Sequence, residues 1–190
     1  MRKAILTAAS VLILAPWTSC AFAHSKSDAP KAAPAPSSSQ VVLSQWNEIG
    51  RKLIAMAEDF PEDKYDFRPV QGVRTFAEGL LHVSNAMYYF TKPVLGQKPP
   101  TEEDPKRENY KTKADVVAFV KKCVEDGAAA IKTKGDKGLA ESYSDPYSKQ
   151  QMQFSDLAYG LIEHSGEHYG QLVVYYRLSG LVPPESRPKK

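Results

Sequence analysis

Two histidines near the end of the chain occupy positions where the surrounding pattern favours apolar side chains. The pattern repeats at three or four residues, as on one face of a helix, and its apolar members are Leu157, Leu161, Leu172 and Tyr175. His164 and His168 continue the same face. Residues four apart have Cβ atoms about 6 Å apart, so their imidazoles can bind one ion with bonds of roughly 2.1 Å. Because an unpaired ring in a core costs on the order of 1 to 3 kcal/mol, we interpret the pair as metal ligands.

His82 completes the predicted site. It lies beside a second apolar helical stripe, where a neighbouring helix can bring it opposite the other two, whereas His24 belongs to a segment rich in Pro, Ala and Ser. Three imidazoles leave at least one coordination position for water, which is typical of catalytic zinc. The predicted ligands of one divalent ion are therefore His82, His164 and His168. We expect zinc or nickel, with manganese or iron as alternatives; hydrogen-bonded core histidines are the competing interpretation.

Two carboxylates flank these ligands and are the candidates for catalytic acid–base chemistry. Glu163 and Glu167 lie one residue from His164 and His168, although the helical pattern also fits solvated surface acids. The letters from His164 to His168 also match the inverted zinc-protease motif, in which Glu167 would be the general base. That site needs a third, acidic ligand well downstream, and the only carboxylate that follows is Glu185 in a Pro-rich stretch. We therefore disfavour the protease interpretation.

Other polar and aromatic side chains are candidates for a pocket near the ion: Asn85, Tyr88, Tyr89 and Tyr169. Aromatic packing in the core explains the tyrosines equally well. Cys123 has the spacing of a small buried residue on a helix, and it is the only cysteine after Cys20. If Cys20 is removed with a signal peptide, no internal disulfide can form.

Four stretches with helical periodicity must position these residues. The first carries Trp46, Leu53 and Phe60 and is ended by Pro61. The others are predicted from Thr75 to about Pro93, from Thr112 to Gly135, and from about Ser155 to Gly180. Thr75 with Glu78 forms a capping box at the start of the second. No stretch alternates long enough to predict a sheet, so we expect an all-α four-helix bundle whose two long connections, 97–111 and 135–150, can cover a site.

The N-terminal residues have the form of an export signal. Met1 to Lys3 is basic, the following run is apolar, and Ala21-Phe22-Ala23 resembles a cleavage site. A membrane anchor or a lipoprotein at Cys20 are the alternatives, but the apolar core before Pro16 is shorter than the about 20 residues of a membrane span. We predict a signal peptide at 1–23, a disordered linker at 24–40, one bundle at 41–182 and a Pro/Lys tail at 183–190. The protein is then periplasmic or extracellular.

The balance of basic and acidic residues indicates which classes of binding partner are expected. The whole chain has 25 basic and 22 acidic residues, and loss of Arg2 and Lys3 with the signal leaves 23 basic residues and a formal charge of +1. No stretch of the bundle is conspicuously basic, so nucleic acid is not an expected partner. We expect a small-molecule substrate, no membrane contact after cleavage, and a homodimer as one assembly that the sequence permits.

The chain after the linker resembles the DinB-like (damage-inducible) proteins. The resemblance is carried by Glu163 to Leu172 and the following Gly180-Leu181-Val182-Pro183-Pro184, and by Tyr65 to Pro69 and Val73 to Val83. It implies a four-helix bundle with a three-histidine divalent site, which maps to His82, His164 and His168. Some relatives of known activity are metal-dependent transferases that use low-molecular-weight thiols, and others were proposed to be hydrolases. An export signal fits thiol transfer poorly, since such thiols are cytosolic reductants.

The leading hypothesis is a metal-dependent transferase or hydrolase of unknown substrate, in which the ion activates water or a thiol. The alternative is a non-catalytic bundle that carries metal or uses it structurally. A third interpretation is a degenerate family member that binds another protein. An open coordination position facing a cleft would favour the enzyme, and a saturated site without a pocket would favour the structural bundle.

Overall fold

The computed structural model describes residues 34–100, 104–145 and 148–188. The chain divides into two units, Met1–Pro34 and Ala35–Lys190. The predicted signal peptide and most of the predicted linker, with His24, lie outside the described residues. Within the described part, no helix is long and apolar enough to cross a membrane.

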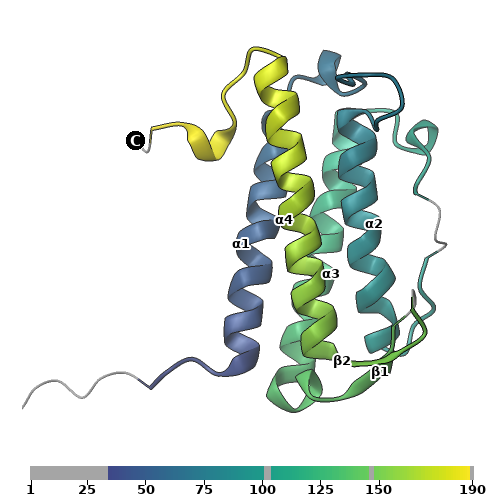
Figure 1. Ribbon diagram of the computed structural model, residues 1–190, viewed down its shortest axis with the longest axis vertical. Coiled ribbons are helices and arrows are strands. Elements are labelled where there is room, and N and C mark those ends of the chain that lie inside the picture. The colour runs from purple at the N-terminus through teal and green to yellow at the C-terminus, as the bar shows by residue number, and fades with distance from the viewer. Residues whose placement is uncertain (1–33, 101–103, 146–147, 189–190) are drawn as a thin grey trace, which may run out of the picture. The chain divides into compact units, whose positions relative to one another are not determined.

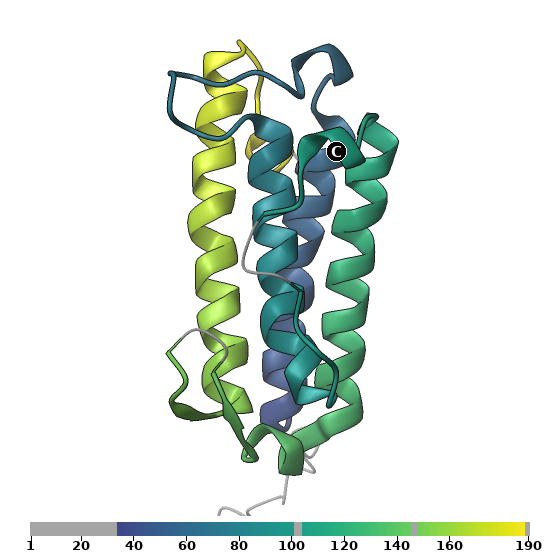
Figure 2. The same ribbon diagram turned by 90° about the vertical axis from the view of Figure 1, so that its right-hand side faces the viewer.

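Four helices form the second unit, as the sequence predicted: α1 (Ser38–Asp59), α2 (Phe76–Val94), α3 (Lys113–Leu139) and α4 (Phe154–Leu178). They run side by side in a bundle (Figures 1 and 2). Helices α1 and α2 each pack against both α3 and α4, so α1 lies diagonally opposite α2. Short 3-10 helices follow at Glu62–Lys64, Arg107–Asn109 and Pro184–Ser186. The all-α bundle is therefore confirmed.

Capping boxes fix the starts of three helices. Thr75 and Thr112 are the N-caps of α2 and α3, and the Thr75 hydroxyl accepts the N–H of Glu78 while the Glu78 side chain accepts that of Thr75. Ser37 and Gln40 form the same motif before α1. Helix α1 consequently begins at Ser38, before the predicted bundle start at residue 41, because Ser37 satisfies N–H groups of the first turn.

The predicted helix stops are close to those observed. Helix α1 ends at Asp59, just before Pro61, and α4 ends at Leu178, just before Gly180. Gly135 interrupts α3 with φ 56° and ψ −166°, a left-handed conformation that favours glycine. One further helical turn follows and ends at Leu139. The interruption lets the chain change direction before it enters the connection to α4.

The core lies along the bundle axis, where the predicted stripes meet. Its largest fully buried side chains are Trp46, Tyr65, Tyr176, Phe60, Phe76 and Phe154. Helices α1 and α3 come especially close at Gly127, where an added Cβ would lie 2.0 Å from the Trp46 ring. The Trp46 indole N–H donates to the Val124 carbonyl at 2.9 Å, which satisfies its polar atom in the core.

A two-stranded antiparallel hairpin occupies the connection between α3 and α4. Strands β1 (Ser142–Ser144) and β2 (Gln151–Gln153) pair with Ser142 opposite Gln153 and Tyr143 opposite Met152. The sequence predicted no sheet, because strands of three residues made mostly of Ser and Gln give no apolar alternation. The hairpin lies at the base of α4 (Figures 1 and 2).

The residues after α4 return to α1. Arg51 donates to both carboxylate oxygens of Glu185 at 2.7 and 2.8 Å, and Arg187 pairs with Asp59. The described part of the predicted tail therefore packs against the bundle through ion pairs.

Candidate metal centre

The three predicted histidines lie together between α2 and α4. His82 comes from α2, and His164 and His168 come from successive turns of α4. Their possible ligand atoms all lie within 4.8 Å of one another. Ring centroids are 5.5 Å apart for His82 and His164, 4.7 Å for His82 and His168, and 4.4 Å for His164 and His168. The side chains are therefore positioned to hold one metal ion.

Hydrogen bonds orient two of the three rings. His82 Nδ1 lies 2.6 Å from Asp104 Oδ1, and because an ionised carboxylate only accepts, Nδ1 is the donor. His168 Nδ1 likewise lies 3.0 Å from Gln171 Oε1, an acceptor. In the neutral form of both rings, a donating Nδ1 leaves the lone pair on Nε2, the form that ligates metal. The donor set thus fits a divalent ion that prefers imidazole nitrogen.

Asp104 is itself anchored. Its Oδ2 accepts from Arg74 Nε at 2.9 Å, so the chain Arg74–Asp104–His82 spans the helix entry, the α2–α3 connection and α2. Burial opposes ionisation of Asp104, but the hydrogen bonds from His82 and Arg74 outweigh it and lower the pKa of the carboxyl. The ionised carboxylate therefore persists at neutral pH and holds the His82 ring.

The electrostatics of the site favour the neutral form of His164 and His168. Burial, followed by repulsion from His164 and His82, lowers the pKa of His168 to about 4. Burial and the neighbouring His82 also lower the pKa of His164. Only a neutral imidazole offers a lone pair to a metal, so both rings are ready to bind at neutral pH.

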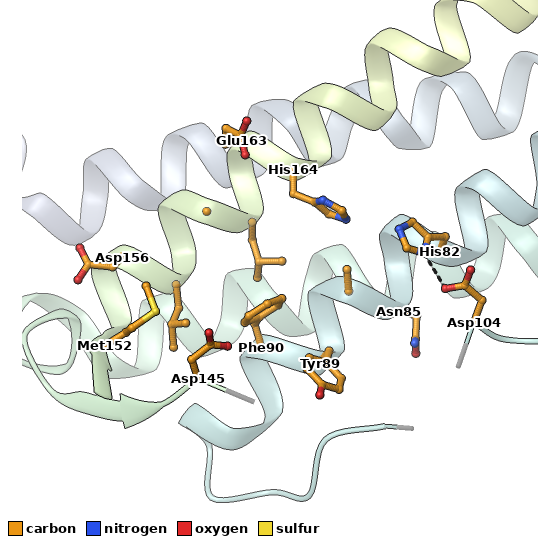
Figure 3. A pocket seen from close by; sticks show the side chains of 14 residues that line it. His82, Asn85, Tyr89, Phe90, Asp104, Asp145, Met152, Asp156, Glu163 and His164 are labelled. Carbon is orange, nitrogen blue, oxygen red and sulfur yellow. Dashed lines mark hydrogen bonds and ion pairs between the residues drawn. The ribbon is translucent and has the colours of Figure 1, made fainter. Parts of the chain in front are cut away.

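A cavity of about 420 Å³ opens beside the histidines (Figure 3). His82 and His164 lie in its wall, and Asn85, Tyr89 and Phe90 of α2 continue the wall away from them. Both long connections contribute to the cavity wall: 97–111 supplies Asp104, and 135–150 supplies Asp145. Met152 comes from β2.

The remaining candidates separate into two groups. Glu163 lines the cavity, whereas Glu167 does not, and both side chains are exposed. Asn85 and Tyr89 line the cavity as predicted.

Two of the predicted tyrosines lie elsewhere. The Tyr88 hydroxyl donates to Asp126 of α3 at 2.5 Å, and the Tyr169 ring faces Lys52 of α1, with Nζ 6.0 Å from its centroid. Cys123 is fully buried, as predicted, and burial raises the pKa of its thiol. Neither tyrosine lines the cavity.

The sequence did not identify Asp104, Arg74 and Gln171. Gln171 follows His168 by three residues on one helix, so its spacing contained the signal. Asp104 lies in a connection without periodicity, among several acidic residues, and its role emerges only when the connection folds across α2.

Comparison with known proteins agrees with this description. A family model for the DinB superfamily matches residues 45–172. A DinB-like protein from Bacillus cereus ATCC 10987 has a TM-score of 0.63 at 18% identity, over 75% of this chain and 93% of its own.

Two further solved structures share the fold. The DinB-like protein YjoA from Bacillus subtilis gives a TM-score of 0.61 at 19% identity, over 78% of this chain and 99% of its own. A conserved protein from Enterococcus faecalis gives a TM-score of 0.55 at 11% identity, over 76% of this chain and 98% of its own. No curated protein matches the chain significantly. At these identities the structural likeness concerns the fold alone.

Proposed function

This chain belongs to the DinB superfamily, and on that premise we propose that it is a metal-dependent enzyme, a transferase or hydrolase that acts on a small molecule. One divalent ion would be held by His82, His164 and His168. The observation that carries the proposal is the grouping of these three imidazoles, two of which, His82 and His164, lie in the wall of a cavity of about 420 Å³. Three protein ligands beside a cavity leave room for a further ligand, as in catalytic sites.

The ion would supply Lewis-acid chemistry and lower the pKa of a water or thiol that it binds, with zinc or nickel as the favoured metals and manganese or iron as alternatives. The chain's own residues orient the imidazoles and accept protons. Asp104 holds the His82 ring through Nδ1, which leaves Nε2 for the ion, and Gln171 does the same for His168. Glu163, in the cavity wall next to His164, is the better placed of the two acidic candidates to accept a proton.

A non-catalytic metal-binding bundle is the alternative. It predicts a fourth protein ligand that completes the coordination. Within the described residues, the grouped metal-binding side chains are the three histidines alone, and the cavity beside them favours the enzyme.

The test is elemental analysis of protein purified from its native host, beside two α4 variants. We expect about one equivalent of a divalent metal in the natural protein and in Tyr159→Ala, which removes a ring that is 72% exposed on the same helix. His164→Ala should lose most of the metal. Equal metal content in His164→Ala and Tyr159→Ala would contradict the site.

Export is part of the proposal, supported by the basic, apolar and small-residue pattern of Met1 to Ala23. N-terminal sequencing of the protein from fractionated host cells should find residue 24 first, outside the inner membrane. A chain that begins at Met1 in the cytoplasm would contradict it.

A further inference from the structure

The cavity beside the histidines has one sign of charge in its wall. Four carboxylates line it, those of Asp104, Asp145, Asp156 and Glu163. Among the lining residues that the structure describes there is no lysine or arginine. Asp104 is neutralised by Arg74, but Asp156 and Glu163 are exposed and form no ion pair among the described residues. These two carboxylates therefore leave negative charge at the mouth of the cavity.

The rest of the wall is apolar and aromatic. Ala86, Leu157 and Leu161 contribute aliphatic surface, and the rings of Tyr89 and Phe90 lie 5.6 Å apart at an interplanar angle of 77°. Aromatic faces attract cations, and they do so more strongly where water is excluded. Carboxylates beside such rings make a site that suits a cation with an apolar body.

Carboxylates lie at both ends of the cavity, and only one end carries the imidazoles. Asp145, Met152 and Asp156 lie near the hairpin and the base of α4, whereas His82 and Asp104 lie at the opposite end (Figure 3). Asp145 is 7% exposed, and its Oδ2 accepts the backbone N–H and the hydroxyl of Ser148 at 3.1 and 2.5 Å. Such hydrogen bonds stabilise the ionised carboxylate.

We propose that this cavity binds a small molecule in which an apolar body carries an ammonium group, and that it disfavours anionic ligands. The ammonium group lies toward Asp156, at the hairpin end of the cavity, and the reactive end of the molecule lies at the imidazoles, beside Glu163. This inference rests on the proposed function, because it assigns a substrate class to the same site. It predicts that the cavity binds low-molecular-weight thiols with several carboxylates poorly.

The experiment compares three probes with one aromatic body and different charge: benzyltrimethylammonium, benzyl alcohol and benzenesulfonate. The quaternary ammonium has no lone pair for a metal, so its affinity reports the cavity alone. Calorimetric titrations use the full chain, metal-free and loaded with Zn²⁺. We expect the cation to bind about tenfold more tightly than the sulfonate in both forms. Equal or tighter binding of the sulfonate in the metal-free protein would overturn the proposal.

Paired variants assign the preference to the cavity. Asp156→Asn with Glu163→Gln should reduce affinity for the cation about fourfold, since each exposed charge contributes a factor of about two. Asp63→Asn with Glu125→Gln changes net charge equally at exposed positions outside the cavity and should leave the affinity unchanged. An equal loss in both double variants would contradict the proposal.

A second pair of variants tests whether the cation binds inside the cavity. Gly160 lines the cavity, and no atom lies within 4 Å of an added Cβ, so Gly160→Leu can fill the mouth without a clash. It should abolish binding of the cation. Gly166→Leu, equally open on α4 but outside the cavity, should not. Unchanged cation binding by Gly160→Leu would overturn the proposal.

Metal titrations separate the two proposals. Protein that binds none of Zn²⁺, Ni²⁺, Mn²⁺ and Fe²⁺ contradicts the proposed function. Protein that binds an ion but shows no preference for the cation contradicts the charge proposal alone.

Discussion

Asp104 gives the candidate metal centre a residue outside the four helices. Its carboxylate joins His82 to Arg74, so the ring that α2 contributes is oriented by a connection that would otherwise be free to vary. A carboxylate behind a metal-binding histidine fixes the tautomer and raises the basicity of the ligating nitrogen. The residue should therefore affect metal affinity without contacting the ion.

Asp104→Asn is expected to weaken Zn²⁺ binding by about 10- to 100-fold, because an amide holds the His82 ring less firmly and no longer polarises it. Competitive titration with a chromogenic chelator measures the change. Asp66→Asn serves as the control, since Asp66 is an exposed partner of Arg107 in the ion pairs of the same region. Equal affinities for Asp104→Asn and Asp66→Asn would show that Asp104 does not position the ligand.

The histidines also make a prediction about pH. In the metal-free protein the pKa of His168 is lowered to about 4, whereas the unfolded chain has the ordinary value near 6.5. Between these values the unfolded chain binds more protons, so the free energy of unfolding falls as the pH is lowered from about 6.5 to 4. One ring contributes up to about 3 kcal/mol.

Urea denaturation of the metal-free protein at pH 7.0 and about pH 4.5 measures this loss. His168→Gln lacks the imidazole at position 168. It should therefore lose less stability over the same pH interval than the natural protein. Identical pH dependence of the two proteins would show that the folded ring titrates normally.

At the scale of helices, local sequence defined most of the architecture. Capping boxes at Thr75 and Thr112 and the apolar stripes placed α2 and α3, and the proline and glycine stops placed the helix ends. The same periodicity revealed two polar residues on the core face of α4, so the grouping of the three histidines could be predicted from the amino-acid sequence. The start of α1 was missed, although Ser37 and Gln40 form the same motif.

The contact of α1 with α3 depends on the absence of a side chain at Gly127. A Cβ there would lie 2.0 Å from the Trp46 ring, and that ring is held by its bond to Val124. Gly127→Ala should therefore destabilise the protein by about 1 to 3 kcal/mol despite the higher helix propensity of alanine.

Gly166→Ala is the matched substitution, in a helix but with open space around the new Cβ. It should raise stability by up to about 1 kcal/mol. Thermal unfolding of both variants measures the difference. A stabilising effect of Gly127→Ala would mean that α1 and α3 can move apart at little cost.

At the scale of the whole molecule, the connections were the least predictable part. Asp104 and the hairpin strands lie in segments whose residues show no helical or strand periodicity. Their positions follow from long-range contacts, such as the reach of Asp104 to His82 and of Glu141 to Phe154. The cavity is built partly from these segments, so two of its four carboxylates, Asp104 and Asp145, could not be placed from the helices.

The limits of the folded unit can be tested by truncation. A protein that begins at Ala35 keeps the Ser37 cap and should unfold at the same temperature as the full chain. A protein that begins at Val41 loses Ser37 and the first residues of α1, and should be less stable by about 1 kcal/mol or more. Equal stability of the two truncated proteins would show that residues before Val41 do not contribute to the folded bundle.

The ligands come from α2 and α4, two helices that adjoin in space but are separated in the chain by all of α3. An ion bound by residues of both helices would act as a removable cross-link between segments that are distant in the sequence. At a thousandfold excess over its dissociation constant, it would add about 4 kcal/mol to the free energy of unfolding. Chelation with EDTA should therefore lower the melting temperature of the natural protein and leave that of His164→Ala unchanged. Metal supply would then govern how long each molecule survives proteolysis.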